Sequence, residues 1–282
     1  MALLAHPAVA ALSALFVWWF STGMVLWIIG SSRCNSRWGL FGAVVLSSAS
    51  LYGLGRSAAD TSVVGAYVAF TCAVLLWGTQ EFGFLAGYIT GPRNQPCPDN
   101  VTGWRRAALA VEAVLYHEFA LVLSGLAVIA ATWNAENQFG TWTYLILWAM
   151  RVSAELNLFL GVPVLNDEFL PKRLSHLTSY FVRKPVSPFF PLVVTVATAV
   201  TTLLVARALS GEGGAFAPTG YMLLASLLAL GALEHWFMVL PLPIAALWGW
   251  SMRSRTDLTS GPGTPLARNA RMRSTVTKVP DP

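Results

Sequence analysis

Long runs of apolar residues recur along the chain and are separated by short polar segments. Each run holds about 20 residues, enough for an α-helix to cross the hydrocarbon core of a bilayer, which is roughly 30 Å thick. Hydropathy predicts seven spans, with approximate bounds 8–29, 39–55, 63–90, 106–132, 140–161, 188–209 and 219–249. The pattern therefore predicts an all-α, polytopic transmembrane helical bundle over residues 1–250.

Two of these runs contain glycines or prolines that modify the prediction. In 219–249 the stretch "LPLP" places Pro241 and Pro243 where they either bend or end the helix, because proline lacks the backbone N–H. In 63–90 the stretch "GFLAGYITG" spaces Gly83, Gly87 and Gly91 four residues apart. Small residues at this spacing predict a face on which another helix packs closely.

Composition and charge agree with a membrane protein. Apolar residues make up 55% of the chain and charged residues 11%, against about 25% charged residues in soluble domains. Fifteen of the 18 Lys and Arg residues fall in alternate loops, namely 30–38, 91–106, 162–187 and the segment after 250. The positive-inside rule then places the N-terminus outside and the C-terminus in the cytoplasm. The net charge of +5 thus reflects topology and contact with the lipid bilayer, and requires no nucleic acid.

Two polar segments are expected on the cytoplasmic side. In the loop 162–187, apolar and aromatic residues recur every three or four positions among four basic residues, which predicts an amphipathic helix on the membrane surface. Asp167 and Glu168 in this loop are candidates for a cytoplasmic cap over buried polar groups. The segment 251–282 is basic and rich in Gly, Pro, Ser and Thr, which predicts a disordered cytoplasmic tail.

Titratable residues interrupt the apolar spans. "YHEF" places His117 beside Glu118, and "LEHW" places Glu234 beside His235. A helical rise of about 1.5 Å per residue puts the buried polar groups in one layer in the cytoplasmic half of the membrane. That layer consists of Glu81, Glu112, His117, Glu118, Arg151, Glu155, Asn157, Glu234 and His235. A charge near mid-membrane costs about 2.5–3.5 kcal/mol or more, so we expect these side chains to meet and neutralise one another.

Three interpretations of this layer remain open. The first is a structural clamp in which Arg151 pairs with Glu155, four residues on along the same helix face, with Glu112 and Asn157 nearby. The second is a ligand site, in which His117 or His235 binds the magnesium of a chlorin or another metal, with Glu81, Glu118 and Glu234 as further candidate ligands. The third is catalysis, with the glutamates and histidines either as ligands of a membrane metalloenzyme or as acid–base groups.

The sequence offers no recognised catalytic motif. Position 121, where an HExxH motif needs its second histidine, is Leu, and the paired E-x-x-H motif of di-iron bundles is absent. Neither a Gly-rich phosphate loop nor a G-x-S-x-G turn occurs. No residue is therefore assigned a catalytic role.

Several stretches together resemble the PuhE family, described as photosynthetic complex assembly proteins of purple and related phototrophic bacteria. The resemblance covers about residues 8–250 and is carried by "LFVWWFSTGMVLWI", "EFGFLAGYITGPR", "LYHE", "NQFGTWTYLILWAMRVSAELNLFLGVPVLNDEFLP" and "LEHWFMVLPLP". It implies a multi-pass protein of the inner, intracytoplasmic photosynthetic membrane, whose gene is associated with that of the reaction-centre H subunit.

The same resemblance implies a function and partners. The function is assembly of the reaction-centre–light-harvesting core complex, with the reaction-centre and light-harvesting polypeptides as partners and bacteriochlorophyll as a transient ligand. The alternative from the residues alone is a membrane-embedded, metal-dependent enzyme acting on a pigment or isoprenoid precursor.

Overall fold

The computed structural model describes residues 2–31, 37–210 and 214–252, and within them it is all-helical with no strand. The long helices are α1 (Pro7–Gly30), α2 (Arg37–Ser57), α3 (Val63–Leu85), α4 (Gly103–Ala131), α5 (Phe139–Leu160), α6 (Phe189–Leu209) and α7 (Phe216–Trp236). These match the seven apolar runs, and the predicted all-α class is confirmed. Of the predicted tail 251–282, residues 253–282 lie outside the described residues.

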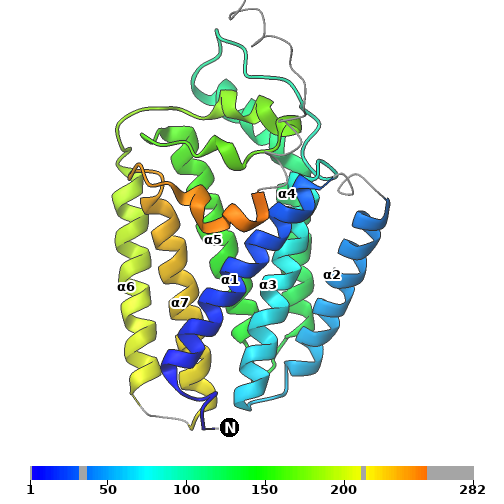
Figure 1. Cartoon of the computed structure of the whole chain (residues 1–282), viewed down its shortest axis with the longest axis vertical. Coiled ribbons are helices and arrows are strands. Elements are labelled where there is room, and N and C mark those ends of the chain that lie inside the picture. The colour runs from blue at the N-terminus through cyan, green and yellow to red at the C-terminus, as the bar shows by residue number, and fades with distance from the viewer. Residues whose placement is uncertain (1, 32–36, 211–213, 253–282) are drawn as a thin grey trace, which may run out of the picture.

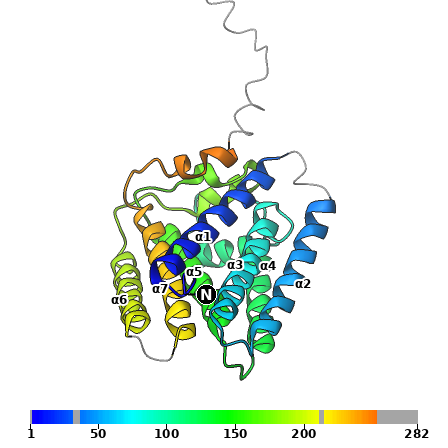
Figure 2. The same ribbon diagram turned by 60° about the horizontal axis from the view of Figure 1, so that its bottom comes forward.

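The helices form a bundle with α3, α5 and α7 at its centre, because each of these three contacts the other two. Figures 1 and 2 show α2 and α6 at opposite edges of the bundle, and α1 running diagonally across α3 and α7. The helix α2 buries only Ser50, Leu54 and Ser57, so most of its apolar surface is left to face lipid. The outer helices α2 and α6 thus lie at the periphery, and the ion pairs described below are made by the central helices.

Six of the seven long helices in the described residues are long and apolar enough to cross a membrane. The exception is α5, whose apolar run is interrupted by Arg151, Glu155 and Asn157. Its 22 residues span about 33 Å, and it packs between α3 and α7. The total of seven spans, with the N-terminus outside, stays a prediction from the sequence.

The last predicted span is shorter than its apolar run. Helix α7 ends at Trp236, whereas hydropathy extended the span to 249. The ring of Pro241 would clash with the carbonyl of residue 237 in a continuous helix, so the chain has to leave the helix before that point. After Pro243 it forms a 3₁₀-helix, η3 (Ile244–Trp248), which packs against α1.

The glycines of "GFLAGYITG" do not form one helix face. Helix α3 ends at Leu85 and not near 90, because Gly87 takes φ +77°, a left-handed conformation that suits glycine and terminates a helix. Gly91 lies beyond the turn and packs on the backbone of α4. The predicted close packing within the protein occurs at Gly91, but there a loop and not a helix packs against α4.

The loop 162–187 differs from its prediction in the type of helix. It forms two 3₁₀ segments, η1 (Asp167–Phe169) and η2 (Lys172–Tyr180), instead of an α-helix. The buried residues Leu174, Leu177 and Tyr180 are three positions apart, which is the 3₁₀ repeat and not the α-helical 3.6. They pack on α3 and α4, at Phe84 and Ala113. The loop thus closes one end of the bundle, above α5 in Figure 1.

Gly91 provides a test of this end of the fold. A Cβ at Gly91 would lie 2.1 Å from the backbone oxygen of Glu112, and backbone cannot move aside as a side chain can. We expect Gly91→Ala to destabilise the protein by about 2 kcal/mol through overpacking. Gly55→Ala on α2, where nothing lies within 4 Å, is the matched control and should be neutral or stabilising. Equal midpoints of unfolding for both variants in mixed micelles would contradict the close approach.

Candidate functional site

An ion-pair network joins α3 and α5 in the interior of the bundle. Nη1 of Arg151 donates to Oε1 and Oε2 of Glu81 at 2.9 and 3.0 Å, and Nη2 lies 2.6 Å from Oε1 of Glu155. The side chain of Arg151 is 17% exposed and that of Glu81 is 21% exposed. The predicted Arg151–Glu155 pair is present, and it extends to a neighbouring helix through Glu81.

His117 lies against this network from α4. Its side chain is fully buried, with Nε2 3.8 Å from Oε1 of Glu81, longer than a hydrogen bond. Its ring packs on Phe84 with centroids 4.6 Å apart, and the guanidinium of Arg151 lies 5.2 Å from the centroid of the same Phe84 ring. Neither ring nitrogen of His117 has a hydrogen-bond partner among the described residues. Helix α4 therefore joins the network by packing.

Three other predicted members of the layer are less well connected. Glu118 lies within electrostatic range of Arg151 and Glu155, and its Oε1 is buried without a hydrogen-bond partner in the described residues. Asn157 is fully buried and donates to the carbonyl of Ser153 on its own helix. Glu112 is half-buried on α4. The structure brings Glu118 close to the network, whereas Asn157 bonds within α5.

Glu234 and His235 are adjacent in sequence but face different neighbours, because successive helical residues are turned by about 100°. Oε1 of Glu234 accepts a hydrogen bond of 2.8 Å from Nε1 of Trp18 on α1. His235 is buried against α5, with Nε2 3.0 Å from the hydroxyl of Ser153 and Nδ1 2.8 Å from the carbonyl oxygen of Gly231. Glu234 thus links α7 to α1, and His235 links α7 to α5.

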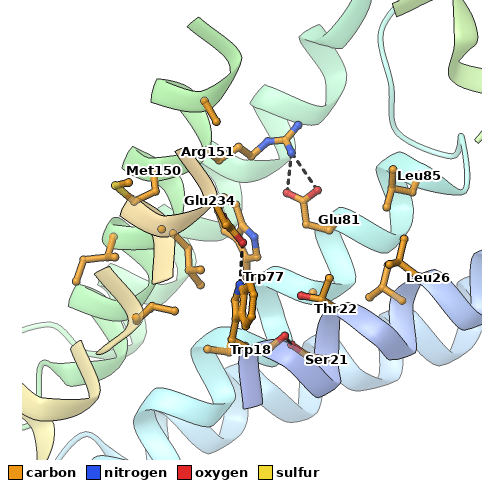
Figure 3. Close-up of a pocket in the computed structure, with 18 residues that line it drawn as sticks. Trp18, Ser21, Thr22, Leu26, Trp77, Glu81, Leu85, Met150, Arg151 and Glu234 are labelled. Carbon is orange, nitrogen blue, oxygen red and sulfur yellow. Dashed lines mark hydrogen bonds and ion pairs between the residues drawn. The ribbon is translucent and has the colours of Figure 1, made fainter. Parts of the chain in front are cut away.

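A cavity of about 330 Å³ lies between α1, α3, α5 and α7. Arg151, Glu81 and Glu234 line it, together with the indoles of Trp18 and Trp77. Figure 3 shows the Arg151–Glu81 pair and the Glu234–Trp18 hydrogen bond as two separate polar contacts around this space. The remaining lining is mostly apolar, so the cavity combines two carboxylates with a hydrophobic wall.

Asp167 and Glu168 are exposed, and the structure does not bring them to the polar layer. The contacts that hold this end of the bundle come instead from arginines and Tyr180. Nε of Arg93 donates to the hydroxyl of Tyr180 at 2.6 Å, and Nη2 of Arg106 donates to the Tyr180 carbonyl. Nη1 of Arg173 donates to the carbonyl of Ala86 at 2.6 Å. These contacts do not follow from the sequence pattern, in which the arginines indicate topology and a polar surface but not their partners.

The histidines are poorly placed to ligate a chlorin magnesium. Such a ligand must present a ring nitrogen to open space, and neither His117 nor His235 lines the cavity. His117 is enclosed by protein, and both nitrogens of His235 lie at hydrogen-bonding distance from other groups. The geometry of the two histidines favours the structural clamp over the pigment site.

The described His, Cys, Asp and Glu residues are not gathered into a metal site. Among residues 2–31, 37–210 and 214–252, no group of three or more His, Cys, Asp or Glu is arranged to hold a metal ion. Catalytic zinc sites use three protein ligands and leave one position open. Here the oxygens of Glu81 already accept from Arg151, so a metal would have to displace a guanidinium from them.

Comparison with known proteins places the chain in a family. Residues 4–259 match the model of a family described as "Protein of unknown function (DUF3623)". The chain belongs to the DUF3623 family. The DUF3623 region includes all seven long helices, and hence every residue of the ion-pair network and of the cavity.

One relative with a similar sequence comes from Rhodobacter capsulatus. It is described as an uncharacterized 30.4 kDa protein in the puhA 5′ region. Over 257 residues it is 42% identical to this DUF3623 chain, covering 89% of this chain and 93% of the relative. No solved structure matches the chain.

Proposed function

We propose that this protein is an integral membrane assembly factor for the photosynthetic reaction-centre–light-harvesting core complex. The observation that carries the proposal is the relative at 42% identity, described as encoded in the puhA 5′ region. That position agrees with the resemblance to the PuhE family, which implies a gene associated with that of the reaction-centre H subunit. The location in the inner photosynthetic membrane, and the reaction-centre and light-harvesting polypeptides as partners, are parts of this proposal.

The architecture supports action within the bilayer. Most of the described residues lie in long helices, so we expect contacts with partners to be made in the membrane or at its surface. The outer helix α2 presents large apolar side chains away from the bundle, with Trp38 70% exposed and Tyr52 71% exposed. Membrane helices associate by surface packing, and such a face suits a spanning segment of a partner polypeptide.

The geometry favours polypeptide handling over pigment chemistry. Neither buried histidine offers a nitrogen to the cavity, and the cavity of about 330 Å³ is at the lower end of small-molecule sites. We therefore propose bacteriochlorophyll delivery only as an indirect consequence of holding the pigment-binding polypeptides.

Deletion of the gene in a phototrophic host tests the proposal. We expect the core complex, measured by its absorption in intact membranes, to accumulate severalfold more slowly after phototrophic growth is induced. Transcripts of the core polypeptides should be unchanged, and the full chain supplied in trans should restore the rate. Assembly at the parental rate would overturn the proposal. Accumulation of a pigment precursor with normal polypeptide insertion would favour the enzyme instead.

A further inference from the structure

The cavity beneath α1 contains a carboxylate whose charge the protein does not balance. The single hydrogen bond or ion pair of Glu234 within the described residues is the one that Trp18 donates. Arg151 is the one Lys or Arg among the cavity residues, and Glu81 and Glu155 already hold its guanidinium. An unpaired carboxylate in an apolar setting is costly, so Glu234 is suited to a partner that carries positive charge.

The walls around Glu234 suit one kind of cation. Trp18 and Trp77 both line the cavity, and tryptophan is the aromatic side chain that attracts ammonium groups most strongly. Leu26, Val74 and Leu227 supply apolar surface beside the two indoles. A carboxylate with aromatic and aliphatic walls matches an alkylammonium group, whose charge is surrounded by carbon. A small hydrated metal ion would find too few oxygen ligands here.

The position of the cavity indicates where the ammonium comes from. All four helices that enclose it belong to the bundle, and Glu234 is itself exposed, so the space is not sealed at this residue. A volume of about 330 Å³ accommodates a head group but not the acyl chains of a lipid. Figure 3 shows Glu234 in direct hydrogen-bond contact with Trp18 at the edge of the space, where an incoming ammonium would replace the indole N–H on the carboxylate.

We propose that the cavity between α1, α3, α5 and α7 binds the ammonium head of a membrane phospholipid, with Glu234 as its counter-ion and Trp18 and Trp77 as its aromatic walls. The phosphate and acyl chains of the lipid stay outside the cavity. This site is independent of the assembly role proposed above, because it rests on the charges and walls of the cavity alone.

Lipid retention by the purified full-length chain tests the site. The protein is placed in nanodiscs of phosphatidylglycerol with 10% phosphatidylethanolamine, and the lipids that remain bound after extraction are counted by native mass spectrometry. We expect phosphatidylethanolamine to be enriched several-fold over its share of the bilayer. Retention in proportion to the bilayer composition would overturn the proposal without the use of any variant.

Variants of Glu234 and Trp18 separate the roles of these two residues. Glu234→Gln keeps the acceptor for Trp18 but removes the charge, and should weaken retention by about tenfold or more, as expected for a hydrogen bond to a charged group. Trp18→Phe keeps an aromatic wall and removes the competing N–H, so retention should stay equal or rise. Glu112→Gln, a half-buried carboxyl outside the cavity, should leave retention unchanged.

Two further outcomes would also overturn the proposal. If Glu234→Gln folds and retains phosphatidylethanolamine as the parent does, the carboxylate is not the counter-ion. If free ethanolamine binds in pure phosphatidylglycerol discs as tightly as the lipid does, the ligand is a soluble amine and not a phospholipid. Failure of ethanolamine to bind at millimolar concentration, together with lipid enrichment, would support the lipid source.

Discussion

Replacing Arg151 with methionine is expected to lower the free energy of unfolding by about 3 kcal/mol or more. Methionine fills a similar volume but leaves Glu81 and Glu155 without their cation inside the bundle. Removing one partner of a buried ion pair costs about 3–5 kcal/mol, because the other charge stays buried and unpaired. The residual exposure of Arg151, 17%, places the expected loss at the lower end of that range. Unfolding by SDS in mixed micelles measures it.

Compensating variants show whether lost charge pairing or lost packing causes the stability loss of Arg151→Met. The triple variant Arg151→Met, Glu81→Gln, Glu155→Gln removes all three charges and keeps the side-chain volumes. It should recover most of the lost stability, because neutral groups of similar shape replace a buried ion network at little net cost. Arg207→Met, near the end of the peripheral helix α6, is the control and should change stability by less than about 0.5 kcal/mol. A triple variant as unstable as Arg151→Met would refute the electrostatic explanation.

The polar network was accessible from the sequence because it follows from a general constraint. Charged side chains in apolar spans must find partners, and a count of residues along each span places Glu81, His117 and Arg151 at one depth. The structure does bring these three residues together. Hydropathy does not predict which side chain forms an ion pair with which. The choice between Glu81 and Glu118 for Arg151 depends on how α3, α4 and α5 rotate about their axes.

The cavity was not predictable for a related reason. At the cavity, α1 and α7 are joined by the hydrogen bond from Trp18 to Glu234, two residues that are 216 positions apart in the sequence. Trp18 stands in a "WWF" run, whose pattern is equally typical of an interfacial anchor. Only the diagonal path of α1 across α7 selects Trp18 to face inward.

The loop 162–187 shows a limit of a different kind. Spacings of three and four residues were both present, and the amphipathic pattern predicted an α-helix. Pro171 lies directly before η2, and only residues 172–184 separate it from Pro185, a length at which an isolated α-helix is marginal in water and depends on packing. Packing on the ends of α3 and α4 then decided in favour of the 3₁₀ form, which aligns every third side chain with the bundle.

Asn137 is a second residue whose role only the structure reveals, and we expect Asn137→Ala to destabilise the protein by about 3 kcal/mol. Asn137 is 1% exposed and precedes Gln138, the N-cap residue of α5. Its Nδ2 donates to the carbonyl oxygens of Ser57, Asp60 and Gly65, at 3.0, 3.1 and 3.0 Å. The amide therefore ties the start of α5 to the end of α2, the turn after it and the first residues of α3. An intramolecular hydrogen bond contributes about 0.5–1.5 kcal/mol net, so the loss of three such bonds with one side chain gives about 3 kcal/mol.

Two matched variants test that Asn137 acts through its donors. Asn137→Asp keeps the shape but places acceptor oxygens opposite three carbonyl oxygens, so it should be at least as destabilising as alanine. Glu136→Ala changes the exposed neighbouring residue and should leave the midpoint of unfolding within about 0.5 kcal/mol of the parent. If Asn137→Asp were as stable as the parent, the hydrogen bonds would not hold the helices together. In that case the junction of α2, α3 and α5 would depend on the backbone hydrogen bond from Asn137 to Ala58 and on apolar packing through Leu54 and Gly140.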